Sequence, residues 1–393
     1  MPSEKPFEFA PHALRLSSRQ WLVVAGVMAV LLWGVPAMWG WFEPLDATGQ
    51  YRLPYDFSND YWFCARWDRT AAATHSTLVL GDSVVWGEYV DMDNTLPAHL
   101  NRLAGGGGAE FANLGMNGLH PAAMLGMVRH HGGSVRHKHV LLVLNTLWMS
   151  SPRHDLREVP KEGEGEEASF NHPSLVPQFA PRVPAYGAPF DTRAGIVVER
   201  AVPFMGWVGH LKAKSDYYAA LAAANPPAHP EPARPVSDEP RIDDPLPTPF
   251  RAFLQPVPAP ENRAHSGPAT WEARGIPVSN VAWPTADESF QWYCFREVVK
   301  LLRARDNSVL VLVTPFNPYL LTPESRRQHE AMVKDMESWL TASGVPFVHG
   351  TPVPTEEYAD ASHPLAPGYA RVATQLLGDA TFKAWVDKAH TPQ

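Results

Sequence analysis

Leu78-Val79-Leu80-Gly81-Asp82-Ser83 is a short apolar run that stops abruptly at a glycine, an acid and a serine. This pattern predicts a buried strand followed by a polar loop. A second polar stretch, Asp360-Ala361-Ser362-His363, lies near the other end of the chain. Together the two supply a nucleophile, a base and a group that orients the base. We therefore expect Ser83, His363 and Asp360 to form one acyl-transfer site.

The chain as a whole alternates between short apolar runs and helical patterns. Such alternation predicts a parallel sheet covered by helices on both faces, that is, a three-layer α/β domain. The domain is expected in two sequence halves, about 75–150 and 285–390. The predicted strands are Ser76–Leu80, Glu110–Leu114, His139–Leu144, Ser308–Val313 and Pro346–His349.

Polar loops follow four of these strands. The carboxyl ends of parallel strands meet at one edge of a sheet, so the loops should converge there. Each motif also has a simpler interpretation. Gly-Asp-Ser could be a turn that caps a helix, and Asp360 to His363 could be a helix N-cap beside a surface histidine. The four loops are Gly81–Ser83, Asn113–Gly118, Asn145–Thr146 and Asp360–His363.

These motifs resemble those of the SGNH (GDSL-type) hydrolase superfamily, whose fold is a flavodoxin-like α/β/α sandwich. Gly81-Asp82-Ser83 is similar to the first motif block of the family. The second block, Asn-x-Gly-x-x-Gly, is matched by Asn113, Gly115 and Gly118. The last block, Asp-x-x-His with a following proline and glycine, is matched by Asp360, His363, Pro364 and Gly368. The resemblance covers the two α/β halves only.

The resemblance implies a role for each matched residue. Ser83 would be the nucleophile, His363 the base and later the acid, and Asp360 the group that holds the histidine. The backbone N–H groups of Ser83 and Gly118 would bind the oxyanion. The third block departs from the Gly-x-Asn-Asp pattern of the family: Asn145 comes early and has no flanking glycine. We expect Asn145 to help bind the oxyanion, the alternative being an asparagine that bonds the backbone at the strand end.

An uncharged stretch near the N-terminus, 21–42, is long enough to cross a bilayer. Arg15 and Arg19 precede it and Glu43 and Asp46 follow it, so residues 1–20 should be a cytoplasmic tail. The chain is then a single-pass protein of the inner membrane with an extracytoplasmic catalytic domain. A cleaved signal peptide, which would give a secreted protein, is the alternative.

The remaining organisation follows from composition. Residues 44–150 and 285–393 are expected to form the two halves of the α/β domain. Residues 151–284 form an insertion with a helical stretch, 194–224, and a proline-rich stretch, which we expect to shape the substrate groove.

The net charge of −8 gives the protein no overall positive field that would attract nucleic acid. No cofactor and no metal ion are expected, since two cysteines are too few for a Cys-based zinc site.

Three functions remain open at this point. The first is an esterase that acts on acyl esters of an extracytoplasmic polysaccharide or lipid. The second is an O-acyltransferase on a cell-surface glycan, working with a membrane-embedded acyltransferase. This architecture is similar to that of alginate O-acetylation proteins and of the D-alanyl transfer protein. The third is a non-catalytic glycan-binding scaffold.

Overall fold

The computed structural model describes residues 16–45, 47, 50–104, 110–158, 171–224 and 255–389. Residues 1–15 of the predicted tail and residues 225–254 of the predicted insertion lie outside this described part. Within it, five parallel strands form one sheet in the order β2-β1-β3-β4-β5. The strands are β1 (Thr77–Gly81), β2 (Phe111–Gly115), β3 (His139–Leu144), β4 (Ser308–Val313) and β5 (Phe347–His349).

The sheet is buried on both faces because its strands are apolar at successive positions. Leu78 and Leu80 of β1 contribute to one hydrophobic core, and Val79, between them, contributes to the other. The same alternation runs through β3 and β4. Continuous apolar runs of this kind are typical of parallel strands covered by helices on both sides. The predicted α/β class with a parallel sheet is therefore confirmed.

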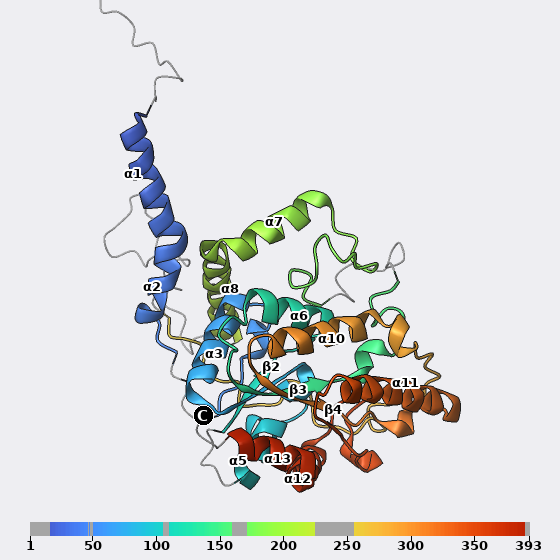
Figure 1. The fold of residues 1–393 in the computed structure, drawn as a ribbon. Coiled ribbons are helices and arrows are strands. Elements are labelled where there is room, and N and C mark those ends of the chain that lie inside the picture. The colour runs from blue at the N-terminus through green and yellow to red at the C-terminus, as the bar shows by residue number, and fades with distance from the viewer. Residues whose placement is uncertain are drawn as a thin grey trace, which may run out of the picture.

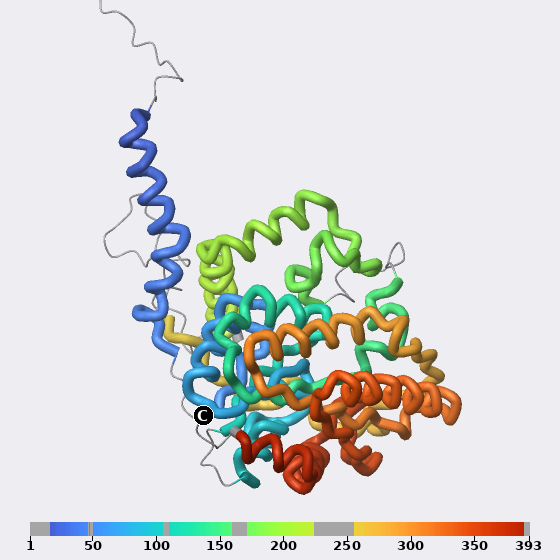
Figure 2. Tube along the Cα trace, viewed as in Figure 1, coloured from blue at the N-terminus to red at the C-terminus, as the bar shows by residue number. Residues whose placement is uncertain are grey.

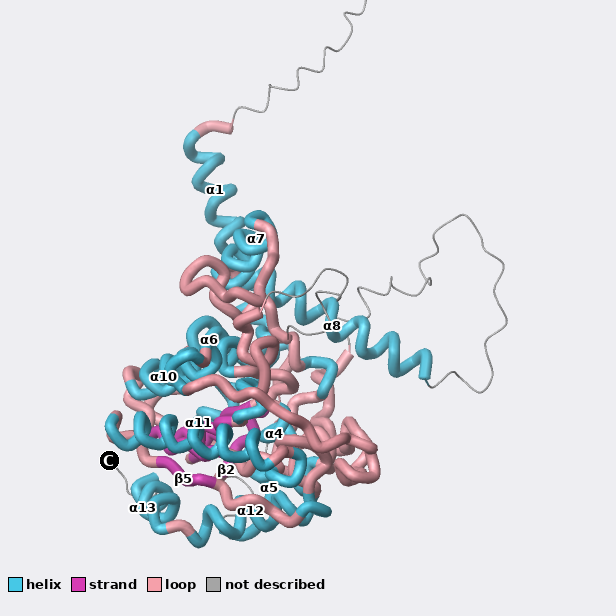
Figure 3. The backbone as a smooth tube through the Cα atoms, turned by 90° about the vertical axis from the view of Figure 1, so that its right-hand side faces the viewer, coloured by secondary structure: helices cyan, strands magenta, loops and turns pink. Residues whose placement is uncertain are grey.

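Helices cover both faces, as Figures 1 and 3 show from two directions. The first face packs against α3 (Tyr61–Thr74), α6 (Pro121–His130), α10 (Phe290–Arg303) and α11 (Pro323–Ala342). The second packs against α4 (Ser83–Trp86), α5 (Leu96–Ala104), α12 (Ala366–Gly378) and α13 (Ala380–Ala389). Short 3₁₀ turns join these elements: η2 (Tyr55–Phe57), η3 (Met92–Asn94), η4 (Thr146–Met149), η6 (Ala286–Glu288), η7 (Pro318–Leu320) and η8 (Thr355–Glu357).

The two sequence halves share this one sheet. β3 from the first half pairs with β4 from the second along the full length of both strands. Figure 2 shows the two halves, cyan to green and orange to red, lying against each other. Strands β1 and β3 are neighbours although β2 lies between them in sequence, so the strand order reverses at β1. Ligand sites of open α/β sheets lie outside the carboxyl ends of the strands at such a point.

One apolar helix precedes the domain within the described residues. It runs through α1 (Ser18–Ala29), the π-helical turn η1 (Val30–Gly34) and α2 (Val35–Phe42). The helix has 25 residues, and an 18-residue window within it has a mean hydropathy of 2.1, so it is long and apolar enough to cross a membrane. Their side chains are mostly exposed, with Leu22 74% and Trp21 60% accessible. These features give modest support to a membrane anchor.

The end of this helix is fastened to the domain by buried charges. Glu43 directly follows α2 and accepts hydrogen bonds from Arg66 of α3 (2.6 Å), from His210 Nε2 (3.0 Å) and from Lys214. His210 also contacts Asp60 at 2.6 Å through Nδ1. Burial raises the pKa of Glu43, but the hydrogen bonds and charges of His210 and Lys214 outweigh it and bring the pKa down to about 2. We call these five residues the Glu43 cluster.

The helical stretch predicted at 194–224 is two helices, not one. They are α7 (Phe190–Ala201) and α8 (Pro203–Ala224). Proline has no N–H to donate and fixes φ, so Pro203 ends α7 and begins α8. Figure 1 shows α8 beside α2, and α7 continues from α8 away from the apolar helix.

Candidate active site

Ser83 is positioned by the turn that leaves β1. It is the first residue of α4, and Asp82 is the N-cap, its Oδ1 accepting the N–H of Val84 at 3.0 Å. The cap fixes the backbone direction where the strand turns into the helix. Ser83 therefore stands at the carboxyl end of the sheet, beside the reversal of strand order.

His363 and Asp360 come to Ser83 from the loop before α12. His363 Nε2 lies 2.8 Å from Ser83 Oγ, and its Nδ1 lies 2.9 Å from both carboxylate oxygens of Asp360. Because a carboxylate can only accept, the Nδ1 atom carries a proton, and in the neutral imidazole Nε2 is left to accept from the serine hydroxyl. Asp360 Oδ1 also accepts the backbone N–H groups of Ser362 and His363, both at 2.9 Å. The fold thus brings together the three residues predicted to act as a unit.

The two predicted oxyanion donors keep their N–H groups unused. Within the described part of the chain, the N–H of Ser83 and the N–H of Gly118 donate to no acceptor. Gly118 follows β2 and has a φ of 68°, a backbone conformation that is unfavourable for residues other than glycine. A Cβ added there would lie 2.4 Å from Asn171 Nδ2. Both N–H groups follow strand ends, and their binding of an oxyanion together stays a prediction.

Asn145 lies in the site, but its side-chain amide is engaged elsewhere. Nδ2 donates to Asp82 Oδ2 at 2.7 Å and to Ser362 Oγ at 3.3 Å, and Oδ1 accepts the N–H of Leu147 at 3.0 Å. The two amide hydrogens therefore hold Asp82 and Ser362 in place in this conformation. To reach an oxyanion, Asn145 would have to release one of them. The hydrogen bond from the N–H of Leu147 is the backbone contact at the strand end that the sequence analysis gave as the alternative to oxyanion binding.

Two residues of the site, Glu88 and Tyr89, were not predicted from the sequence. They follow Gly87, which ends α4 after one turn at φ 90°. The next residue, Glu88, has its Oε2 atom 4.0 Å from His363 Nε2. Tyr89 packs its ring against the imidazole with 5.3 Å between centroids. The glycine that follows a single helical turn is the sequence signal that could have pointed to them.

The carboxylates around His363 determine its charge. Burial lowers the pKa of His363, but the charge and hydrogen bond of Asp360, with the charges of Asp82 and Glu88, raise it above its ordinary value. Burial likewise raises the pKa of Asp360, yet its contacts with His363 hold that pKa far below the usual range. An imidazolium at His363 is therefore stabilised. The same charges oppose the neutral form that acts as a base.

The arrangement has the chemical parts that serine acyl transfer needs. A hydroxyl lies within hydrogen-bond reach of an imidazole nitrogen, and a carboxylate orients the imidazole. Ser83 and His363 are each 6% exposed, so the reacting atoms are nearly shielded from water. Comparison of the chain with known proteins gives no further assignment, since no family model matches it and no curated protein shows significant similarity to it.

Proposed function

We propose that this protein is an extracytoplasmic serine hydrolase of SGNH type that acts on acyl esters of a polysaccharide or lipid. The observation that supports the proposal best is the continuous contact from Ser83 Oγ through His363 to Asp360, with separations of 2.8 and 2.9 Å. The parallel sheet and its strand order are compatible with the flavodoxin-like fold of that superfamily. The apolar helix 18–42 would anchor the domain.

The reaction proceeds in two steps. Ser83 Oγ attacks the carbonyl carbon of the ester while His363 Nε2 takes the serine proton. The tetrahedral oxyanion faces the N–H groups of Ser83 and Gly118, each such donor contributing about 3 kcal/mol. Collapse breaks the ester C–O bond, and the alcohol leaves with the proton from His363. Water then adds to the acyl-Ser83 intermediate in the same way and releases the carboxylic acid.

An O-acyltransferase is the second candidate, and the attachment of the anchor favours it. The Glu43 cluster fixes the end of the apolar helix to α3 and α8 through buried charges. A domain held rigidly at the membrane suits a reaction in which a membrane-embedded acyltransferase supplies the acyl group. A sugar hydroxyl would then replace water in the second step.

A fluorophosphonate probe tests the nucleophile in the full-length protein in detergent. We expect the wild type to gain one covalent adduct, mapped to Ser83 by peptide mass, and Ser83→Ala to gain none. Heat-denatured wild type is the control for non-specific labelling. A folded wild type that does not react would reject the enzyme and favour a glycan-binding scaffold.

A second measurement separates hydrolysis from transfer. The protein is incubated with an ester whose acetyl group carries an isotopic label, with and without added oligosaccharide. The label is then measured in free acetate and on the sugar. Release of free acetate supports the hydrolase. Acetyl groups on the sugar with little free acetate support the transferase.

A further inference from the structure

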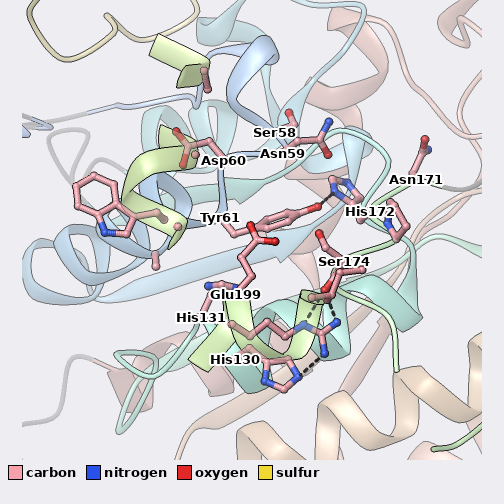
Figure 4. A pocket seen from close by; sticks show the side chains of 18 of the residues that line it. Ser58, Asn59, Asp60, Tyr61, His130, His131, Asn171, His172, Ser174 and Glu199 are labelled. Carbon is pink, nitrogen blue, oxygen red and sulfur yellow. Dashed lines mark hydrogen bonds between the residues drawn. The ribbon is translucent and has the colours of Figure 1, made fainter. Parts of the chain in front are cut away.

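A cavity of about 1410 Å³ lies between α3 and α6 on one side and α7 and α8 on the other. We call it the α7 cavity. Figure 4 shows Tyr61 reaching across it toward His172, with Glu199 and His131 nearby. Pockets for one drug-sized ligand measure about 300–1,000 Å³, so this cavity has room for an extended ligand.

The walls of the α7 cavity combine aromatic rings with uncharged hydrogen-bonding groups. Tyr55, Tyr61 and Trp62 line it and are each only partly buried. The amides of Asn59 and Asn171 lie among the lining side chains and are exposed. Aromatic faces pack against the C–H faces of sugar rings, while amides bond to sugar hydroxyls. This mixture matches a saccharide better than the purely apolar wall that an acyl chain prefers.

The charges around the α7 cavity disfavour an anionic ligand. Arg200 is the one arginine or lysine among the described lining residues, and Asp56 and Glu199 also line the cavity, as does Asp60, whose carboxylate is paired with His210. The guanidinium of Arg200 already donates to the carbonyl oxygens of Ser174 (2.7 Å from Nε) and Val176 (2.8 Å from Nη2). It is therefore committed to the backbone.

The histidines of the cavity add no positive charge at neutral pH. Burial lowers the pKa of His131 and of His172 to about 4. The pKa of His130 is also lowered to about 4, by burial and by the charges of Arg200 and Arg129. A carboxylate or phosphate on a ligand would meet the charges of Asp56 and Glu199, and Arg200, the cation of the described wall, has N–H groups already bonded to the backbone.

One end of the α7 cavity adjoins the candidate oxyanion site. Asn117 lines the cavity, donates to Tyr55 Oη at 2.7 Å, and precedes Gly118 in the chain. Asn171 lines the cavity and packs against Gly118, so closely that a Cβ on that glycine would touch it. The lining of the cavity therefore reaches the residue before Gly118 and the side chain packed on Gly118, whereas Ser83, Asp360 and His363 are not among its described lining residues.

We propose that the α7 cavity binds an uncharged saccharide chain and presents its acyl-bearing or acceptor hydroxyl to Ser83. This rests on the proposed function and narrows its substrate to a neutral glycan. The acidic side chains of the wall disfavour polyuronates and phosphate-linked polymers. The cavity supplies binding along the chain, and the three residues at Ser83 supply the chemistry.

Binding of hexasaccharides tests the proposal without requiring turnover. Full-length Ser83→Ala protein in phosphatidylcholine nanodiscs is titrated by calorimetry with cellohexaose, maltohexaose, xylohexaose and N-acetylchitohexaose. Hexagalacturonate is the anionic probe of equal length. We expect at least one neutral hexasaccharide to bind and hexagalacturonate to bind at least tenfold more weakly. A tenfold difference in Kd corresponds to about 1.4 kcal/mol of binding free energy.

A matched pair of variants locates the binding. Ile196 of α7 lines the cavity, whereas Val198 of the same helix is 57% exposed and does not. Ile196→Trp should fill the cavity and weaken binding at least tenfold, and Val198→Trp should leave it unchanged.

Several outcomes would overturn the proposal: no binding of any neutral hexasaccharide, tighter binding of hexagalacturonate, or equal affinity of the two tryptophan variants. A phospholipid that co-purifies with wild type and is expelled by Ile196→Trp would assign the cavity to lipid instead. Fluorophosphonate labelling is read separately. Labelling without glycan binding rejects only the cavity assignment, and glycan binding without labelling rejects only the hydrolase.

Discussion

Replacing Glu88 with glutamine should shift the pH dependence of Ser83 reactivity toward acid. The Glu88 carboxylate stands 4.0 Å from His363 Nε2, the nitrogen that must be free to take the serine proton. Its charge favours the imidazolium. His363 is inactive as a base below its pKa, so reactivity rises as the pH rises through that pKa. Removing the Glu88 charge lowers the pKa, and the acidic limb of the profile moves down with it.

The size of the shift follows from the separation and the exposure of the two groups. Unit charges 4 Å apart interact by about 4 kcal/mol at an effective dielectric constant near 20. The Glu88 side chain is 19% exposed and that of His363 is 7% exposed, so water reduces this value. Opposite charges at such distances shift a pKa by about one to three units. We expect a shift of about one unit, equivalent to about 1.4 kcal/mol.

The second-order rate of fluorophosphonate labelling, measured across pH, reports this limb without a known substrate. One pH unit below the wild-type limb, Glu88→Gln should react roughly fivefold faster, since its imidazole is half rather than one-tenth deprotonated. Glutamine keeps the shape of the side chain and can still bond Ser266 Oγ, which lies 3.1 Å from Glu88 Oε1. Glu337→Gln, which alters another Glu–His contact (2.7 Å, to His349), is the control. An unshifted limb, or an equal shift in the control, would refute the reasoning.

Three further substitutions test other parts of the structure. Asp360→Asn places an amide against Nδ1 of His363 and should lower kcat by about 10⁴-fold, measured with an ester substrate at fixed pH. Glu43→Gln leaves the buried Lys214 without its full partner and should lower the free energy of unfolding by about 3–5 kcal/mol, measured by urea titration in detergent. Gly118→Ala forces a Cβ into a conformation at φ 68° and should lower kcat by up to about 10²-fold without loss of the folded state by circular dichroism.

The strands and the three-residue unit could be predicted because each has a local signal. The run His139–Leu144 is apolar at five consecutive positions after the histidine, and the structure has β3 over those residues. Ser83 and His363 lie 280 residues apart in sequence. They meet because both follow elements that end at the same edge of a parallel sheet. The polar motifs that follow the strands therefore predicted a contact between residues far apart in sequence.

Of the helices next to the apolar helix, the stretch 194–224 was predicted to be helical and is, as α7 and α8, but no helix was predicted over α3. α3 (Tyr61–Thr74) was missed because tyrosine, tryptophan and phenylalanine crowd its first turn and hide the helical period. Its N-cap, Asp60, is a signal that could have revealed it, since its Oδ1 accepts the N–H of Phe63. The Glu43 cluster joins residues up to 171 positions apart, and a single sequence holds no sign of such pairing.

The Glu43 cluster also connects the anchor to the α7 cavity. Glu43, next to the apolar helix, bonds Arg66 of α3 and Lys214 of α8, and these two helices supply opposite walls of the cavity. Trp39 of α2 and Trp207 of α8 stack edge to face with 5.3 Å between centroids, which adds an apolar contact at the same junction. The residues that hold the end of the apolar helix therefore belong to the same two helices that line the cavity.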